Sequence, residues 1–116
     1  MSYLFRYARR PGSVAPRKPG VRVDEYARLN LPGLYGDAFV RVLVEDTSNA
    51  RRRAAEPQLV LQIADCIHTI NLEFSLSTAQ LRENSLHKVD TLLGALRRFR
   101  GALAAEAELA ALRERR

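Results

Sequence analysis

The sequence comes closest to a reactive site at Cys66 and His68, which lie two positions apart beside Asp65. In a β-strand, residues i and i+2 point to the same face, so the thiol and the imidazole could act together. A thiolate–imidazole pair supports nucleophilic chemistry or metal binding. No third ligand follows nearby, and apolar strand-forming residues flank the pair. We therefore expect Cys66 to be a packed structural cysteine.

A second set of possible metal ligands is Glu83, His87 and Asp90, spaced i, i+4 and i+7 along a predicted helix. This spacing places all three on one helix face, where carboxylate and imidazole ligands can meet a metal. Such sites take further ligands from a second helix, which only an oligomer could supply here. A solvated face with a Glu83–His87 pair is the favoured interpretation.

Familiar catalytic signatures are missing from the sequence. It contains no glycine-rich dinucleotide or phosphate loop, no H-E-x-x-H, no G-x-S-x-G and no C-x-x-C. The sequence therefore predicts a protein that is not an enzyme and has no cofactor and no metal site.

The charge is distributed unevenly along the 116 residues. The chain carries 19 basic and 13 acidic side chains, for a net charge of +6. Residues 1–22 hold six of the basic side chains and no acidic one, so the rest of the chain is balanced. Proline and glycine recur in the same stretch and disfavour a helix or a central strand. We therefore expect residues 1–22 to form an extended basic arm.

A basic arm with aromatic residues suits a polyanion, with nucleic acid as the favoured ligand. Arginine contacts phosphates through its planar fork, and aromatic rings stack on bases. Docking on a neighbouring subunit or a protein partner is the main alternative, and a passive tail is another. A polar loop later in the chain could extend the binding surface. The predicted binding residues are Tyr3, Phe5, Arg6, Tyr7, Arg9, Arg10, Arg17, Lys18 and Arg22 in the arm, and Arg51, Arg52 and Arg53 in the loop.

Alternating apolar residues predict a small antiparallel sheet of about three strands. Residues 38–46 carry valines at every second position. Residues 58–76 are apolar at odd positions up to Ile67 and at even positions from Ile70, so the phase changes between them. A turn within 65–69 would give strands at about 58–64 and 69–76, and one long bulged strand is the alternative. Residues 21–23 could add a short edge strand, and Asp24 could cap one helical turn after it.

The C-terminal third of the chain predicts one long helix over about residues 78–115. Ser77 and Gln80 match a capping box at its start. Apolar residues then follow at steps of three and four, as in a coiled coil, although Glu106 takes the next core position. A helix of roughly 57 Å exceeds a small domain, so it should break near Gly101 or pack on another copy. Gly94 and Gly101 could allow close helix approach or be merely tolerated. The predicted oligomerisation residues are Val89, Leu92, Leu96, Phe99 and Leu103.

Together these features predict an α+β fold in which residues 23–116 form one domain, with the helix packed across the sheet and projecting past it. The expected function is that of a small, non-enzymatic, oligomeric binding or assembly protein whose arm engages a polyanion. The alternative is a structural component of a virion or other large assembly, or a small inhibitor, whose arm docks on protein. With one cysteine and no long apolar segment, we expect a cytoplasmic protein or one within an assembled particle, without membrane contact or secretion.

Overall fold

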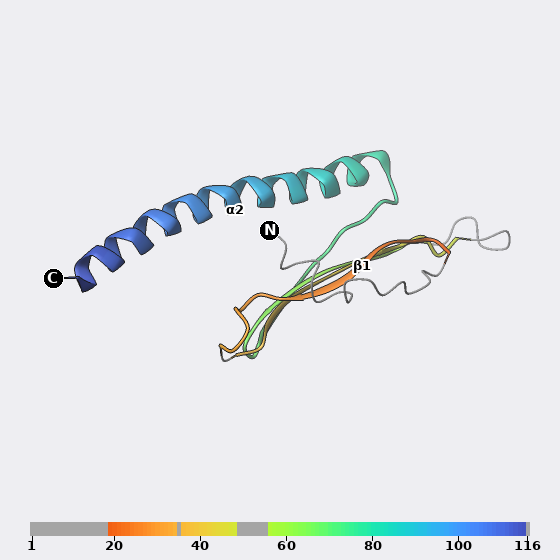
Figure 1. Cartoon of the computed structure of the whole chain (residues 1–116). Helices are drawn as coiled ribbons and strands as arrows, with labels where there is room; N and C mark the ends of the chain where they lie inside the picture. Colours follow the sequence, from red (N-terminus) through yellow and green to blue (C-terminus); the bar gives the residue numbers. More distant parts are fainter. Residues whose placement is uncertain (1–18, 35, 49–55, 116) are drawn as a thin grey trace. The chain divides into compact units, whose positions relative to one another are not determined.

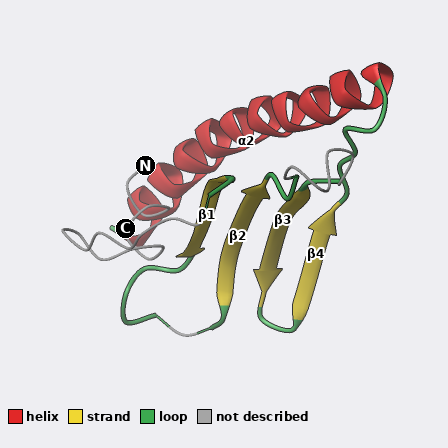
Figure 2. Cartoon of the chain, turned by 90° about the vertical axis from the view of Figure 1, so that its right-hand side faces the viewer, coloured by secondary structure: helices red, strands yellow, loops and turns green. Residues whose placement is uncertain are grey.

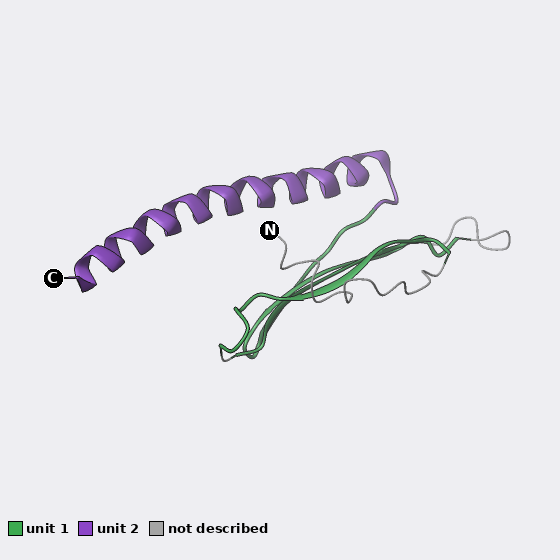
Figure 3. Ribbon diagram, in the orientation of Figure 1, with its two compact units in different colours: residues 1–75 green, residues 76–116 purple. Residues whose placement is uncertain are grey.

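A computed structural model of the chain describes residues 19–34, 36–48 and 56–115. By its internal contacts the chain divides into two compact units, residues 1–75 and residues 76–116 (Figure 3). The first unit contains the sheet and the second contains the helix.

The sheet consists of four strands, β1 (Val21–Arg28), β2 (Ala38–Glu45), β3 (Gln58–Asp65) and β4 (His68–Leu72). Their spatial order is β1-β2-β3-β4, and each neighbouring pair is antiparallel (Figure 2). The predicted α+β fold with an antiparallel meander and one long C-terminal helix is confirmed. The sheet has one strand more than the roughly three that periodicity indicated.

The extra strand is β1, which is much longer than the predicted edge strand at residues 21–23. It pairs with β2 from Val21 opposite Glu45 to Arg28 opposite Phe39, with a register shift between Val21 and Val23. The predicted helical turn after Asp24 is wrong. Pairing with β2 gives the β1 backbone its hydrogen-bond partners, and this outweighs the weak strand propensity of Asp24 and Glu25.

The two faces of the sheet differ in chemistry. Cross-strand pairing gathers a nearly continuous aliphatic surface on one face, interrupted by Glu25 opposite Val42. The other face is mixed, and on it Tyr26 stacks on Phe39 with ring centroids 5.0 Å apart. The aliphatic face carries Val23, Ala27, Val40, Val42, Val44, Leu59, Leu61, Ile63, Ile70 and Leu72.

The phase change in residues 58–76 arises from a two-residue hairpin loop, Cys66–Ile67. Asp65 lies opposite His68, and Ile63 lies opposite Ile70. In this register, odd positions of β3 face even positions of β4, so both strands keep their aliphatic residues on one face. The prediction of two strands is confirmed, although β4 ends at Leu72 rather than near residue 76.

The helix α2 (Ala79–Glu114) runs unbroken for 36 residues, a length of about 54 Å (Figure 1). It continues through Gly101, so the predicted possibility of a break there is wrong. Its N-cap is Thr78, whose Oγ1 accepts a hydrogen bond from the Leu81 backbone N–H at 3.1 Å. The predicted cap, Ser77, lies one residue too early. With Thr78 as the cap, Leu81 rather than Gln80 occupies the third helical position, where a capping box needs a polar side chain.

Candidate functional site

The five predicted oligomerisation residues lie together on one side of α2. At 3.6 residues per turn, Val89 to Leu103 span an arc of roughly 80° around the helix axis. Leu96, Phe99 and Leu103 keep 53%, 65% and 54% of their surface exposed, and Val89 and Leu92 are half-buried. We call these five residues the α2 seam. The structure thus gathers them into one apolar stripe, and self-association remains the prediction attached to it.

The stripe is wider than the seam alone. Leu93 and Leu86 lie along one flank and are exposed, and Ala95 and Ala102 lie along the other flank. Apolar residues at four of the seven heptad positions make a broad contact face, as on a helix that packs against a sizeable partner.

The sheet is too small to cover α2 along its whole length. An eight-residue strand is about 27 Å long, and four strands are about 15–20 Å across, so the diagonal is about 32 Å. The helix is about 54 Å long. At least about 20 Å of α2 therefore extends beyond any surface that the sheet can offer it.

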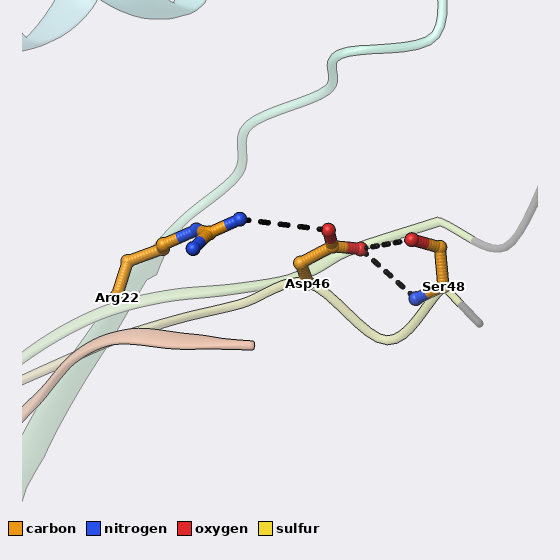
Figure 4. A network of polar contacts seen from close by, with 3 residues as sticks. All are labelled: Arg22, Asp46 and Ser48. Atoms are coloured by element: carbon orange, nitrogen blue, oxygen red, sulfur yellow. Dashed lines mark hydrogen bonds and ion pairs between the residues drawn. The ribbon is translucent and has the colours of Figure 1, made fainter. Parts of the chain in front are cut away.

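Most of the predicted polyanion-binding residues lie outside the described part of the chain. These are all the arm residues from Tyr3 to Lys18 and the loop residues Arg51, Arg52 and Arg53. Arg22 is described, and it belongs to β1 rather than to the arm. Its guanidinium lies 3.6 Å from Asp46 Oδ2, with 67% of the side chain exposed (Figure 4).

The sheet attaches both basic segments at the same end. The Gly20 carbonyl accepts a hydrogen bond from the Asp46 N–H at 2.9 Å, just before β1 begins. On the other side of β2, Thr47 Oγ1 donates to the Glu56 carbonyl at 2.8 Å and closes the base of the loop that carries the three arginines. The sequence alone does not indicate this proximity, because it depends on the β1–β2–β3 register.

Asp46 lies between these two attachment points, and its surroundings favour the ionised carboxylate. The Ser48 hydroxyl and backbone N–H both donate to Asp46 Oδ1, at 2.6 and 2.9 Å (Figure 4). These two bonds lower the pKa of the Asp46 carboxyl below its ordinary value of 3.8, and nearby Arg22 lowers it further. Asp46 is therefore an anion at neutral pH, and it turns the chain into the loop.

Cys66 is not the packed residue that the sequence predicted. It is exposed, lies in the β3–β4 loop with φ of +55°, and its backbone N–H donates to the Asp37 carbonyl at 2.8 Å. His68 is the first residue of β4, so the pair straddles a turn instead of sharing a strand face. The apolar residues on either side belong to β3 and β4, and they led to the wrong prediction that Cys66 is packed among them.

The predicted solvated face of α2 is exposed as expected, but the contact that the structure gives His87 is with Thr91 rather than with Glu83. Glu83, His87 and Asp90 are all exposed, and Thr91 Oγ1 lies 3.4 Å from His87 Nε2. Across the described ranges, no three histidine, cysteine, aspartate or glutamate side chains are grouped so that they could hold a metal ion.

Sequence reasoning missed a set of exposed aliphatic residues at the end of the sheet that carries the β1–β2 and β3–β4 connections. Leu29, Leu31 and Leu34 lie in or beside the β1–β2 connection, and Ile67 lies in the β3–β4 loop with 91% of its surface exposed. The two connections meet through the hydrogen bond from Cys66 to Asp37. The basic segments are attached at the opposite end of the strands.

Comparison with protein-family models, with curated proteins and with solved structures gives no match to this chain. In the part of the chain that the structure describes, no helix combines the length and the apolar character needed to span a bilayer.

Proposed function

We propose that the chain is a non-enzymatic assembly protein that self-associates through the α2 seam and engages a polyanion with its basic N-terminal segment. The observation that carries this proposal is the exposed seam on a helix longer than the sheet. An exposed apolar stripe favours association, because association removes its surface from water. A second copy supplies an identical stripe.

The polyanion part of the proposal is supported by charge and by attachment. Residues 1–18 contain five basic side chains and no acidic one, and the loop at 49–55 adds three arginines. Both segments leave the sheet at the end marked by Gly20 and Asp46. A locally concentrated positive charge of this kind attracts a phosphate backbone, so nucleic acid is the favoured ligand.

Self-association is tested by light scattering on the wild-type chain and on a variant with both Leu96→Asp and Phe99→Asp. We expect the wild type to exceed 13.1 kDa at micromolar concentration and the variant to be monomeric. Leu112→Asp is a matched control, because Leu112 is exposed to a similar degree but lies on another side of α2. A monomeric wild type contradicts the proposal.

Polyanion binding is tested by salt titration of the full chain and of a variant lacking residues 1–18. The deletion stops at residue 18 because Gly20 bonds to Asp46 and Val21 starts β1. Five phosphate contacts give a slope of log K against log salt of roughly −3.5 on single strands and −4.5 on duplex DNA. Truncation should remove most of this slope.

Replacing Tyr3, Phe5 and Tyr7 by alanine should weaken single-strand binding by about 1–3 kcal/mol per stacked base and leave the slope nearly unchanged. If the full chain binds neither DNA nor RNA at low salt, the segment is a protein-docking element. The protein would then be a structural component of a larger assembly or an inhibitor.

A further inference from the structure

We infer that two copies of α2 pack antiparallel, in the register that places Arg82 opposite Glu106 of the second copy and Glu106 opposite its Arg82. This inference rests on the self-association proposed above and adds its geometry. The argument uses the charged residues that continue the stripe at both ends of the α2 seam.

Two charged residues occupy core positions of the same heptad pattern. Arg82 lies one heptad before Val89, and Glu106 lies one heptad after Phe99. At about 100° per residue, both fall at the edges of the stripe formed by the seam. Both are exposed, and one Nη of Arg82 donates to the Leu76 carbonyl at 3.0 Å. A charge at such a position favours an arrangement that supplies the opposite charge from the facing helix.

An antiparallel pair satisfies both charges in a single register. With Arg82 level with Glu106, Val89 lies level with Phe99 of the second copy, and Leu92 lies level with its Leu96. The two-fold axis then passes at the level of Gly94, so every one of these pairs occurs twice. The two ion pairs close the two ends of the apolar layers.

The flank of the stripe agrees with this register, whereas Leu103 gains no apolar partner from it. Leu103 lies level with Ser85, which is polar and already buried in the chain. Leu93, on the flank of the stripe, lies within one residue of the axis and meets its own symmetry mate.

A parallel pair in register makes the opposite arrangement of charges. Residues of the same number then face each other, so Arg82 meets Arg82 and Glu106 meets Glu106. Like charges placed together at a contact are unfavourable. The stripe therefore selects the antiparallel orientation. In that orientation the two helix starts at Ala79 lie about 45 Å apart along the axis.

The first test is a charge exchange in the full-length chain, with the dimer dissociation constant measured by sedimentation. We expect Arg82→Glu alone and Glu106→Arg alone each to weaken the dimer by about tenfold or more, because each creates two like-charge contacts. The double variant should return to within about threefold of the wild type. Arg82 and Glu106 are about 36 Å apart on one helix, so this rescue can act only between copies.

The control pairs Arg82→Glu with Glu108→Arg, which has the same net charge as the double exchange. Glu108 lies on the side of α2 away from the stripe, so this variant should stay as weak as Arg82→Glu alone. Equal rescue by both double variants would show a general charge effect and overturn the register.

The second test measures the distance between spin labels on Ala105→Cys in a Cys66→Ser background. The antiparallel register places the two labelled positions about 33 Å apart along the axis, whereas a parallel pair places them at one level, about 10 Å apart between axes. If the wild-type chain is a monomer, the proposed self-association is wrong. A dimer with the short distance, or one without charge rescue, leaves self-association standing and overturns this register.

Discussion

Gly20 occupies a position at the base of β1 that a residue with a side chain cannot fill without movement. Its φ is +89°, and a Cβ built on it would collide with the carbonyl oxygen of Asp46. Its own carbonyl accepts the Asp46 N–H. We expect Gly20→Ala to lower the free energy of unfolding by about 2–3 kcal/mol, from combined backbone strain and the clash.

Gly33→Ala separates these two contributions in the same urea titration. Gly33 has nearly the same φ, +87°, but a Cβ added to it would meet no atom within 4 Å. This variant should therefore lose only about 1 kcal/mol, from backbone strain alone. Equal losses at the two glycines would mean that a Cβ at position 20 does not collide with the Asp46 carbonyl.

Cys66 adopts positive φ without being glycine, and the thiol is exposed. Cys66→Gly should raise the free energy of unfolding by about 0.5–1 kcal/mol, because relief of the left-handed strain exceeds the flexibility that glycine adds to the unfolded chain. Cys66→Ala keeps the strain and should change little. A loss of several kcal/mol in Cys66→Ala, measured by urea denaturation, would restore the interpretation of a packed thiol.

Asp46 makes the stability of the sheet depend on pH. Its pKa is lowered in the folded chain, first by the Ser48 hydroxyl, so the ionised carboxyl stabilises the fold at pH values above the ordinary pKa of 3.8. That contribution is lost as the pH falls through the lower folded-state pKa. Ser48→Ala should raise the Asp46 pKa toward 3.8 in a carboxyl NMR titration. An unchanged pKa in Ser48→Ala would assign the shift to other groups.

At the scale of the elements, the two glycines of α2 are not contact points within the described chain. A Cβ at Gly101 would meet no atom within 4 Å, and a Cβ at Gly94 would meet only the end of the Arg98 side chain. Both glycines lie on the side of the helix away from the α2 seam. We therefore expect Gly101→Ala to raise the free energy of unfolding by about 1 kcal/mol through helix propensity.

The same Gly101→Ala variant tests the other interpretation of these glycines, close helix approach. If Gly101 lay in a helix–helix contact, the added methyl would weaken self-association in sedimentation even while it favoured the helix. An unchanged dissociation constant together with a higher melting temperature supports contact through the α2 seam.

At the scale of the whole molecule, self-association and folding should be linked. Few of the described side chains are buried, namely those of Ala27, Ala38, Leu43, Ala64 and Ser85. A second copy that covers the seam would therefore add a large share of the buried apolar surface. We expect the melting temperature to rise with protein concentration in the wild type and to be constant in the variant with Leu96→Asp and Phe99→Asp. A wild-type melting temperature that does not depend on concentration would contradict this linkage.

The sequence by itself determined the elements whose signal is local. Valines at every second position predicted β2, and the phase change between Ile67 and Ile70 predicted the β3–β4 hairpin. The three–four spacing from Val89 to Leu103 predicted α2 and its apolar stripe. Each pattern follows from the period of a single element, so neighbouring residues are enough to reveal it.

Tertiary structure decided the features that depend on residues far apart in the sequence. Asp24 to Arg28 form a strand because β2 supplies their hydrogen-bond partners. Cys66 is an exposed turn residue because Asp65 pairs with His68, which leaves Cys66 and Ile67 as the hairpin loop. The common attachment of the two basic segments, at Gly20 and Asp46, depends on the order and register of three strands. Local propensity is weak beside such pairing, which only the folded sheet provides.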